Sequence, residues 1–90
     1  MMPSSSPSAP VPVILYTRVG CHLCDVVKET LEAAQTERAF ALSVVDIDTD
    51  PALRALYTDE VPVVMVAGRK AFKYRMTREA FFDKLDRAAP

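Results

Sequence analysis

Two cysteines three positions apart, Cys21 and Cys24, are the only cysteines of this chain, and they lie between two segments of different pattern. The run Val13–Tyr16 before them is apolar throughout, which is typical of a short strand buried on both faces. After them, from His22 to about Thr36, apolar residues recur at the spacing of one helical face. The pair therefore lies where a strand passes through a short loop into the first turn of a helix.

The rest of the chain predicts three further strands and two helices. Asp50 and Pro51 form a helix start, because an aspartate caps the first turn and proline suits the first helical position. The turn at Ala67-Gly68-Arg69 joins the last two strands, which are then antiparallel. The expected elements after the first helix are strand 40–47, short helix 51–57, strand 61–66, strand 70–75 and a last helix capped by Thr77.

This order, strand-helix-strand-(short helix)-strand-strand-helix, predicts an α/β fold. The first two strands are joined by a helix and are expected to be parallel, with a right-handed crossover. A mixed sheet of four strands flanked by helices is the economical way to pack such elements. Proline at position 62 has to stand at the very start of its strand, because it cannot donate to the ladder.

Length and composition fit one domain over residues 13–90. Residues 1–12 are rich in Pro, Ser and Ala and uncharged, which is typical of a disordered tail. They lack the basic start and apolar run of a secretory signal, so a cytoplasmic protein with reduced thiols is expected. A net charge of −1 and the lack of a long apolar stretch argue against nucleic-acid and membrane partners. A monomer is the default expectation.

The position of the cysteines predicts different roles for the two thiols. Cys21 lies at the helix start, where unpaired N–H groups and the helix dipole favour a thiolate, and Arg18 adds positive charge nearby. Cys24 lies one turn deeper. Cys21 is then expected to attack a substrate disulfide, and Cys24 to resolve the mixed disulfide. His22 either tunes or shields that thiolate or simply faces solvent.

Other roles for the pair stay open. A closed zinc site needs four ligands, and the chain has no second Cys/His cluster, so no metal ligands are assigned. Inert core cysteines are a further alternative. At the level of function, the alternatives to an enzyme are a non-catalytic peptide-binding module and an iron–sulfur cluster carrier that uses Cys21 in a dimer.

Two stretches resemble the glutaredoxins. Tyr16–Cys24 (Tyr-Thr-Arg-Val-Gly-Cys-His-Leu-Cys) is similar to their active-site segment, in which a Tyr-Ser/Thr-Lys lead-in precedes Cys-x-x-Cys. Val61–Val63 (Val-Pro-Val) resembles their second element, a Val-Pro whose proline is cis and faces the cysteines. The resemblance covers roughly residues 13–88 and is closest to short bacterial glutaredoxin-like proteins of the thioredoxin-fold superfamily.

The resemblance implies a thiol–disulfide oxidoreductase that reduces or exchanges disulfides of proteins or small molecules. Cys21 corresponds to the nucleophile and Cys24 to the resolving thiol. Arg18 corresponds to the upstream basic residue and Pro62 to the cis-proline. Backbone groups of Val61 would then bind an extended substrate strand. A separate reductant, which the sequence does not identify, would restore the dithiol.

The chain departs from the glutaredoxin pattern where glutathione is usually held. Gly20 replaces an aromatic residue, and Glu60 stands where threonine is common. The Gly-Gly turn and the Asp at the start of the last helix are missing from the stretch 69–77. No tightly bound cofactor is expected. Glutathione remains a candidate reductant, although this chain lacks the groups that usually bind it.

Charged residues also gather in two places. Five basic residues fall within ten positions, which is explained either by a patch for an acidic partner or by the solvated face of an edge strand. Five acidic residues gather upstream without the spacing of a calcium loop, which is typical of a solvated loop. The basic residues are Arg69, Lys70, Lys73, Arg75 and Arg78, and the acidic ones Asp46, Asp48, Asp50, Asp59 and Glu60.

Overall fold

The computed structural model describes residues 10–88, and it has the predicted order of elements. Most of the predicted tail, residues 1–9, lies outside the described residues. The first strand begins at Pro12, one residue before the predicted boundary. The elements are β1 (Pro12–Thr17), α1 (His22–Ala34), β2 (Ala41–Asp46), the 3-10 helix η2 (Ile47–Thr49), α2 (Pro51–Tyr57), β3 (Val63–Val66), β4 (Arg69–Lys73) and α3 (Arg78–Ala88).

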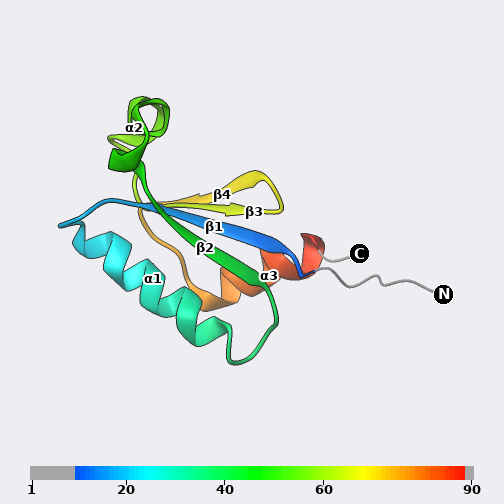
Figure 1. Cartoon of the computed structure of the whole chain (residues 1–90). Coiled ribbons are helices and arrows are strands. Elements are labelled where there is room, and N and C mark those ends of the chain that lie inside the picture. The colour runs from blue at the N-terminus through cyan, green and yellow to red at the C-terminus, as the bar shows by residue number, and fades with distance from the viewer. Residues whose placement is uncertain (1–9, 89–90) are drawn as a thin grey trace.

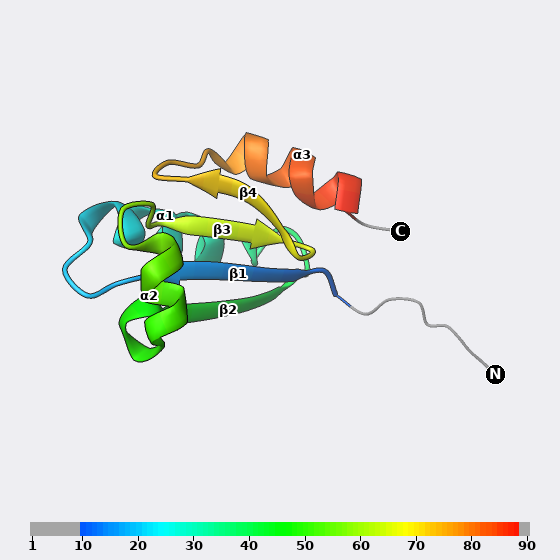
Figure 2. The same cartoon turned by 90° about the horizontal axis from the view of Figure 1, so that it is seen from above.

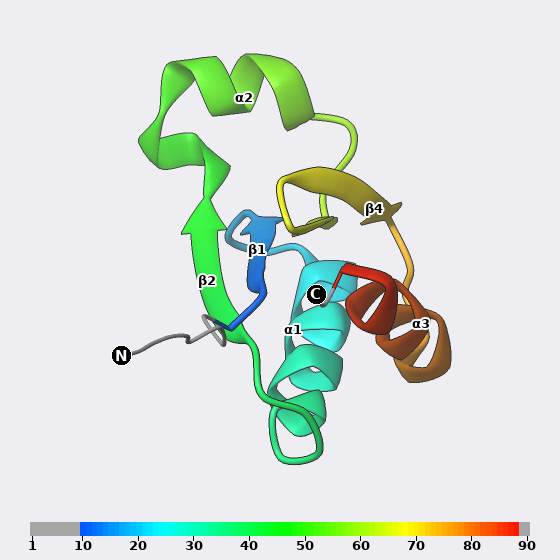
Figure 3. The ribbon, with the colours of Figure 1, turned by 90° about the vertical axis from the view of Figure 1, so that its right-hand side faces the viewer.

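The four strands form one mixed sheet in the order β2-β1-β3-β4 (Figure 1). β1 is parallel to β2 and β3 is antiparallel to β4, as predicted, and β3 is also antiparallel to β1, a pairing that the sequence did not predict. Helices α1 and α3 lie together on one face of the sheet, and α2 lies on the other side, near the carboxyl end of β1 (Figure 3). The α/β fold with a four-stranded mixed sheet is thereby confirmed.

The core lies between the sheet and the pair α1 and α3. Alternate residues of β1 and β3 point into it, because successive side chains of a strand face opposite sides. The edge-to-face pair Phe40–Phe81, with ring centroids 5.0 Å apart, closes the core beneath the sheet. Its other buried members include Val13, Leu15, Val27, Leu31, Val64, Val66 and Leu85.

Helix α2 is short and contributes no buried side chain. Tyr57 at its end stacks on Tyr16 of β1, with ring centroids 4.8 Å apart. Asp50 caps the helix as predicted, since its carboxylate accepts from the N–H of Ala52 at 2.9 Å. The stacking of Tyr57 on Tyr16 places α2 and the loop after it over the same end of the sheet as the cysteines.

The two edges of the sheet differ in character. β4 carries Arg69, Lys70 and Lys73, all exposed, whereas β2 has no charged side chain before its last residue. The N–H of Ala41 donates inward to the carbonyl of Val11 at 3.0 Å. Because backbone groups alternate along a strand, those of Leu42 and Val44 point outward.

Within residues 10–88, none of the helices has the length and apolar character needed to cross a membrane.

Candidate redox site

The two cysteines form a disulfide at the start of α1, with Cα atoms 5.2 Å apart. Cys21 is the N-cap residue of the helix, and its extended backbone (φ −90°, ψ 105°) directs the sulfur over the first turn. The N–H of Cys24 donates to Sγ of Cys21 at 3.1 Å. Gly20 just before them has φ +84°, a conformation that side chains rarely adopt, so the turn into the helix favours glycine.

The two sulfurs differ in exposure. Cys24 is 1% exposed on the buried face of α1, whereas Cys21 is half-buried at the surface. His22 is exposed, and Val19 in the preceding loop is 89% exposed. Cys21 is therefore accessible from solution and Cys24 is shielded, as expected from the position of Cys24 one turn deeper in the helix.

The side chain of Arg18 is directed to an acidic residue rather than left free for the cysteines. Its Nε and one terminal nitrogen donate to the carboxylate of Asp48 at 3.1 and 2.8 Å, a two-pronged ion pair between the β1–α1 loop and η2. Its backbone carbonyl accepts from the N–H of Cys21 at 3.3 Å. Arg18 thus orders the loop before Cys21, with much of its charge balanced by Asp48.

The Val61–Pro62 peptide bond is cis, which confirms that expectation. Pro62 is buried and Val61 is half-buried, immediately before β3. The strand predicted from residue 61 begins at Val63, because Val61 and Pro62 still belong to the loop. Val63 in turn pairs with Tyr16 at the end of β1, so this loop and the cysteines lie at the same end of the sheet.

Tyr74, which the sequence did not single out, ties this loop to the segment after β4. Its N–H donates to the carbonyl of Pro62 at 2.8 Å, and its hydroxyl donates to the carbonyl of Asp59 at 2.8 Å. Its backbone has φ +69°, unusual for a tyrosine. Two hydrogen bonds from one residue therefore fix the chain on both sides of Glu60 and Val61.

A groove of about 230 Å³ lies between the first turns of α1 and the segment after β4. Leu23, the residue between Cys24 and His22, forms part of its wall. The groove is largely apolar, and Arg75 is its charged member, with no ion pair to any residue between 10 and 88. The full lining is Leu23, Val26, Val27, Tyr74, Arg75, Met76 and Thr77.

Glu60, the acid before Val61, is paired within the chain. Lys70 donates to its carboxylate at 2.6 Å and lies over the ring of Tyr57 at 5.6 Å. That hydrogen bond holds the pKa of Glu60 below its ordinary value, and it raises the pKa of Lys70. The pair links the loop before β3 to the edge strand β4.

Of the residues assigned to the site, Cys21, Cys24, Val61 and Pro62 lie at the same end of the sheet, whereas the side chain of Arg18 pairs with Asp48 and His22 is exposed. The basic stretch lies on and after the edge strand β4, and it is divided among several neighbours: Lys70 contacts Glu60, and Arg78 pairs with Glu37. No three metal-ligating side chains gather anywhere in the part of the chain that the structure describes.

Comparison with known proteins finds relatives over most of the chain. The family model "Glutaredoxin-like domain (DUF836)" matches residues 12–86. A protein described as the uncharacterized protein Rv0508 of Mycobacterium tuberculosis is 38% identical over 63 residues, which is 64% of this chain and 65% of the relative. The chain thus spans slightly less than two thirds of the length of the curated relatives that it matches.

Solved structures agree with the fold. The protein XcR50 of X. campestris is 38% identical, with a TM-score of 0.69 and coverage of 87% of this chain and 99% of that one. A mutant thioredoxin from Halobacterium salinarum NRC-1 has a TM-score of 0.67 at 19% identity, covering 90% of this chain and 76% of that one. At that identity the likeness concerns the fold, which is of the thioredoxin type.

Proposed function

Because this chain belongs to the glutaredoxin-like domain (DUF836) family, we propose that it is a thiol–disulfide oxidoreductase with Cys21 as its attacking thiol. The observation that carries the proposal is the asymmetry of the disulfide. Cys21 is accessible and caps helix α1, whereas Cys24 is buried one turn below it.

In the reducing direction, the Cys21 thiolate attacks one sulfur of a substrate disulfide. A mixed disulfide forms, and the other substrate sulfur leaves as a thiolate. Cys24 then loses its proton and attacks Sγ of Cys21, which closes the Cys21–Cys24 disulfide and releases the second substrate thiolate. Two electrons pass from the protein dithiol to the substrate, and a thiol reductant must return them before the next turnover.

The N-terminus of α1 supports the first step. The N–H that contacts Sγ of Cys21 is a donor that stabilises a sulfur anion there, and the helix dipole acts in the same sense. The thiolate is the reactive form, so this arrangement raises the fraction of attacking species. Arg18 contributes by ordering the loop, since its charge is engaged by Asp48.

The surroundings favour a substrate with an apolar segment beside its disulfide. Val19 and Val26 are exposed on either side of Cys21 in the sequence, and the adjoining groove is mostly apolar. The backbone of Val61 lies between Asp59 and Pro62, whose carbonyls accept from Tyr74, and it would bind the substrate chain as an extended strand. Glutathione is a weaker candidate, because Glu60 adds a carboxylate near this loop, although Lys70 partly balances it.

The test is an equilibrium titration in glutathione redox buffers, with acid quenching and an intact mass at each point. Loss of two hydrogens with one midpoint, absent from Cys21→Ser and Cys24→Ser, is the expected result. A persistent glutathione adduct would indicate monothiol chemistry. Two free thiols across the whole range would refute the proposal and favour a peptide-binding module. A coloured protein from air-free purification would favour a cluster carrier.

A further inference from the structure

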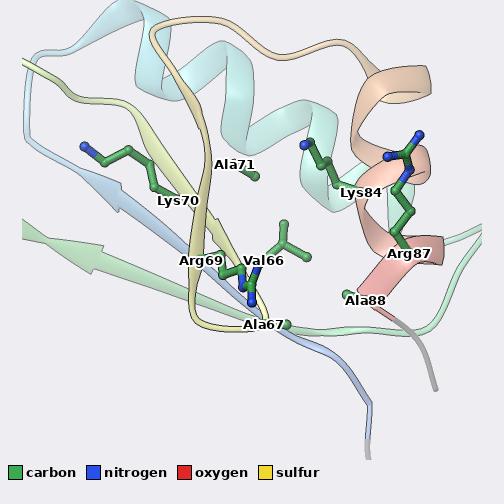
Figure 4. Close-up of a pocket in the computed structure, with 8 residues that line it drawn as sticks. All are labelled: Val66, Ala67, Arg69, Lys70, Ala71, Lys84, Arg87 and Ala88. Atoms are coloured by element: carbon green, nitrogen blue, oxygen red, sulfur yellow. The ribbon is translucent and has the colours of Figure 1, made fainter.

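A cleft of about 600 Å³ lies between the β3–β4 turn and the C-terminal half of α3 (Figure 4). It is at the end of the sheet opposite the cysteines. Val66, in its wall, pairs with Val13 at the start of β1, whereas Cys21 follows the end of that strand. Figure 2 shows the β3–β4 turn and the start of α1 at opposite ends of the molecule. The cleft is therefore separate from the redox site.

The charged residues lining this cleft are all cationic. Arg69 and Lys70 come from β4, and Lys84 and Arg87 from α3. Figure 4 shows Lys84 extending from the helix towards the hairpin. The remaining lining is small and apolar: Val66, Ala67, Ala71 and Ala88. Lys70 extends away from the hollow towards Glu60 (Figure 4), so three cations from two separate elements remain beside it in a chain whose net charge is −1.

Two of these cations have no partner of opposite charge within residues 10–88. Lys70 is held by Glu60, and Arg87 pairs with Asp83 one turn earlier on the exposed surface of α3 at 3.2 Å. Arg69 and Lys84 form no ion pair with any residue from 10 to 88. They lie on opposite walls of the cleft, so an anion between them would neutralise both, and Arg87 could join because exposed pairs are weak.

The shape of the cleft favours a compact ligand. Its volume falls within the range of small-molecule sites, about 300–1,000 Å³. Ala67 has φ +52°, a conformation that turns usually assign to Gly, Asn or Asp, and its methyl group leaves the cleft wide at the turn. The guanidinium groups of Arg69 and Arg87 can each offer two parallel donors to an oxyanion, and Lys84 adds a point charge.

We propose that this cleft binds a small, multiply charged oxyanion. The shared chemistry is two or more phosphate or carboxylate groups on a compact molecule. The site would act independently of the disulfide, because the cleft shares no lining residue with the groove beside the cysteines and lies at the other end of the sheet.

The test follows backbone amide signals of the ¹⁵N-labelled oxidised protein during titration with pyrophosphate and, separately, with citrate. Saturable shifts confined to residues around Ala67 and Ala88 are the expected result, and the tighter probe tells phosphate from carboxylate. The double variant Arg69→Gln/Lys84→Gln should weaken binding by about tenfold or more. Shifts spread over the whole surface, or none that saturate with either probe, would overturn the proposal.

Two further variants separate the cleft from general charge effects. Lys28→Gln removes an exposed cation of α1 without an ion pair to residues 10–88, and it should leave the affinity within about twofold of wild type. Ala88→Phe fills part of the cleft and keeps every charge, so it should weaken binding. Equal losses in Lys28→Gln and in the double variant, or unchanged affinity in Ala88→Phe, would contradict a site in this cleft. Since binding is the readout, the result does not depend on redox activity.

Discussion

Replacing Cys24 with serine leaves Cys21 as a single thiol at the N-cap of α1, and we expect that thiol to be much more acidic in the folded than in the unfolded chain. The N–H of residue 24 lies 3.1 Å from the sulfur. A hydrogen bond to a charged group contributes about 1.5–3 kcal/mol, and a helix terminus about 0.3–1 kcal/mol. Arg18 adds little, because Asp48 engages its charge.

The lower ends of these ranges give about 1.8 kcal/mol in favour of the thiolate. Solvent screening at the half-buried Cys21 reduces this free energy. A free energy of about 1.4 kcal/mol corresponds to a thiolate-to-thiol ratio that is tenfold higher at a given pH. The assay is the ultraviolet absorbance of the thiolate as a function of pH, in buffer and in concentrated urea. Cys21→Ser is the matched control, since burial disfavours the thiolate of Cys24.

Stability should follow the same linkage. The pKa of the Cys21 thiol is expected to be lower in the native than in the unfolded chain. In the Cys24→Ser variant, the native thiolate of Cys21 therefore adds to the free energy of unfolding. This contribution is complete above the pKa of the thiol in the unfolded chain, and it is lost as the pH falls through the native pKa. Urea midpoints at several pH values measure this. Identical thiolate titrations in buffer and in urea would show that the helix start does not activate Cys21, and the reasoning would fail.

Three other changes test the fold around the site. Tyr74→Phe removes the hydrogen bond to the carbonyl of Asp59 and should lower the free energy of unfolding in urea by about 0.5–1.5 kcal/mol. The variant should also reduce disulfides more slowly. Unchanged turnover would leave Tyr74 a purely structural role. Leu31→Ala should cost about 2.7–5 kcal/mol by the same assay, because Leu31 is fully buried, and a loss below about 1 kcal/mol would contradict the packing. Lys70 lowers the pKa of Glu60, so this pair stabilises the fold above pH 4.5 and stops doing so as the pH falls through the native pKa. Glu60→Gln should therefore reduce the loss of thermal stability on the acid side, measured as melting temperature against pH. An unaltered pH profile would exclude the pair as the source of that loss.

The order of the elements along the chain and the directions of the first two and last two strands could be predicted from the sequence because they depend on local periodicity and turns, whereas the pairing of β3 with β1 could not. The apolar run before the cysteines and the helical spacing after them identify β1 and α1, and the turn at Gly68 makes β3 and β4 antiparallel. The predicted strand 40–47 was too long at its end. Asp46 accepts from the N–H of Asp48 at 2.9 Å and turns the chain into η2, so the buried Ile47 belongs to that turn.

The details of the site depend on contacts between distant residues, which a single sequence does not display. Arg18 was expected beside Cys21, yet its side chain pairs with a residue thirty positions away. Tyr74 was missed because its role depends on a positive φ, and a tyrosine in a sequence does not indicate that conformation as a glycine does. The position of the cysteine pair followed from the local pattern, whereas the cis bond before Pro62 was expected only because its neighbours resemble a known family.

The unequal edges of the sheet determine how the protein behaves when it is concentrated. A chain that approached β4 would meet three cations, whereas β2 offers the outward N–H and C=O groups of Leu42 and Val44 with no charge until Asp46. Exposed edges of this second kind are where sheets of separate molecules join. Loss of material by aggregation during storage should therefore begin at β2, and a single lysine at Val44, which is 42% exposed, is the change that would best preserve a clear solution.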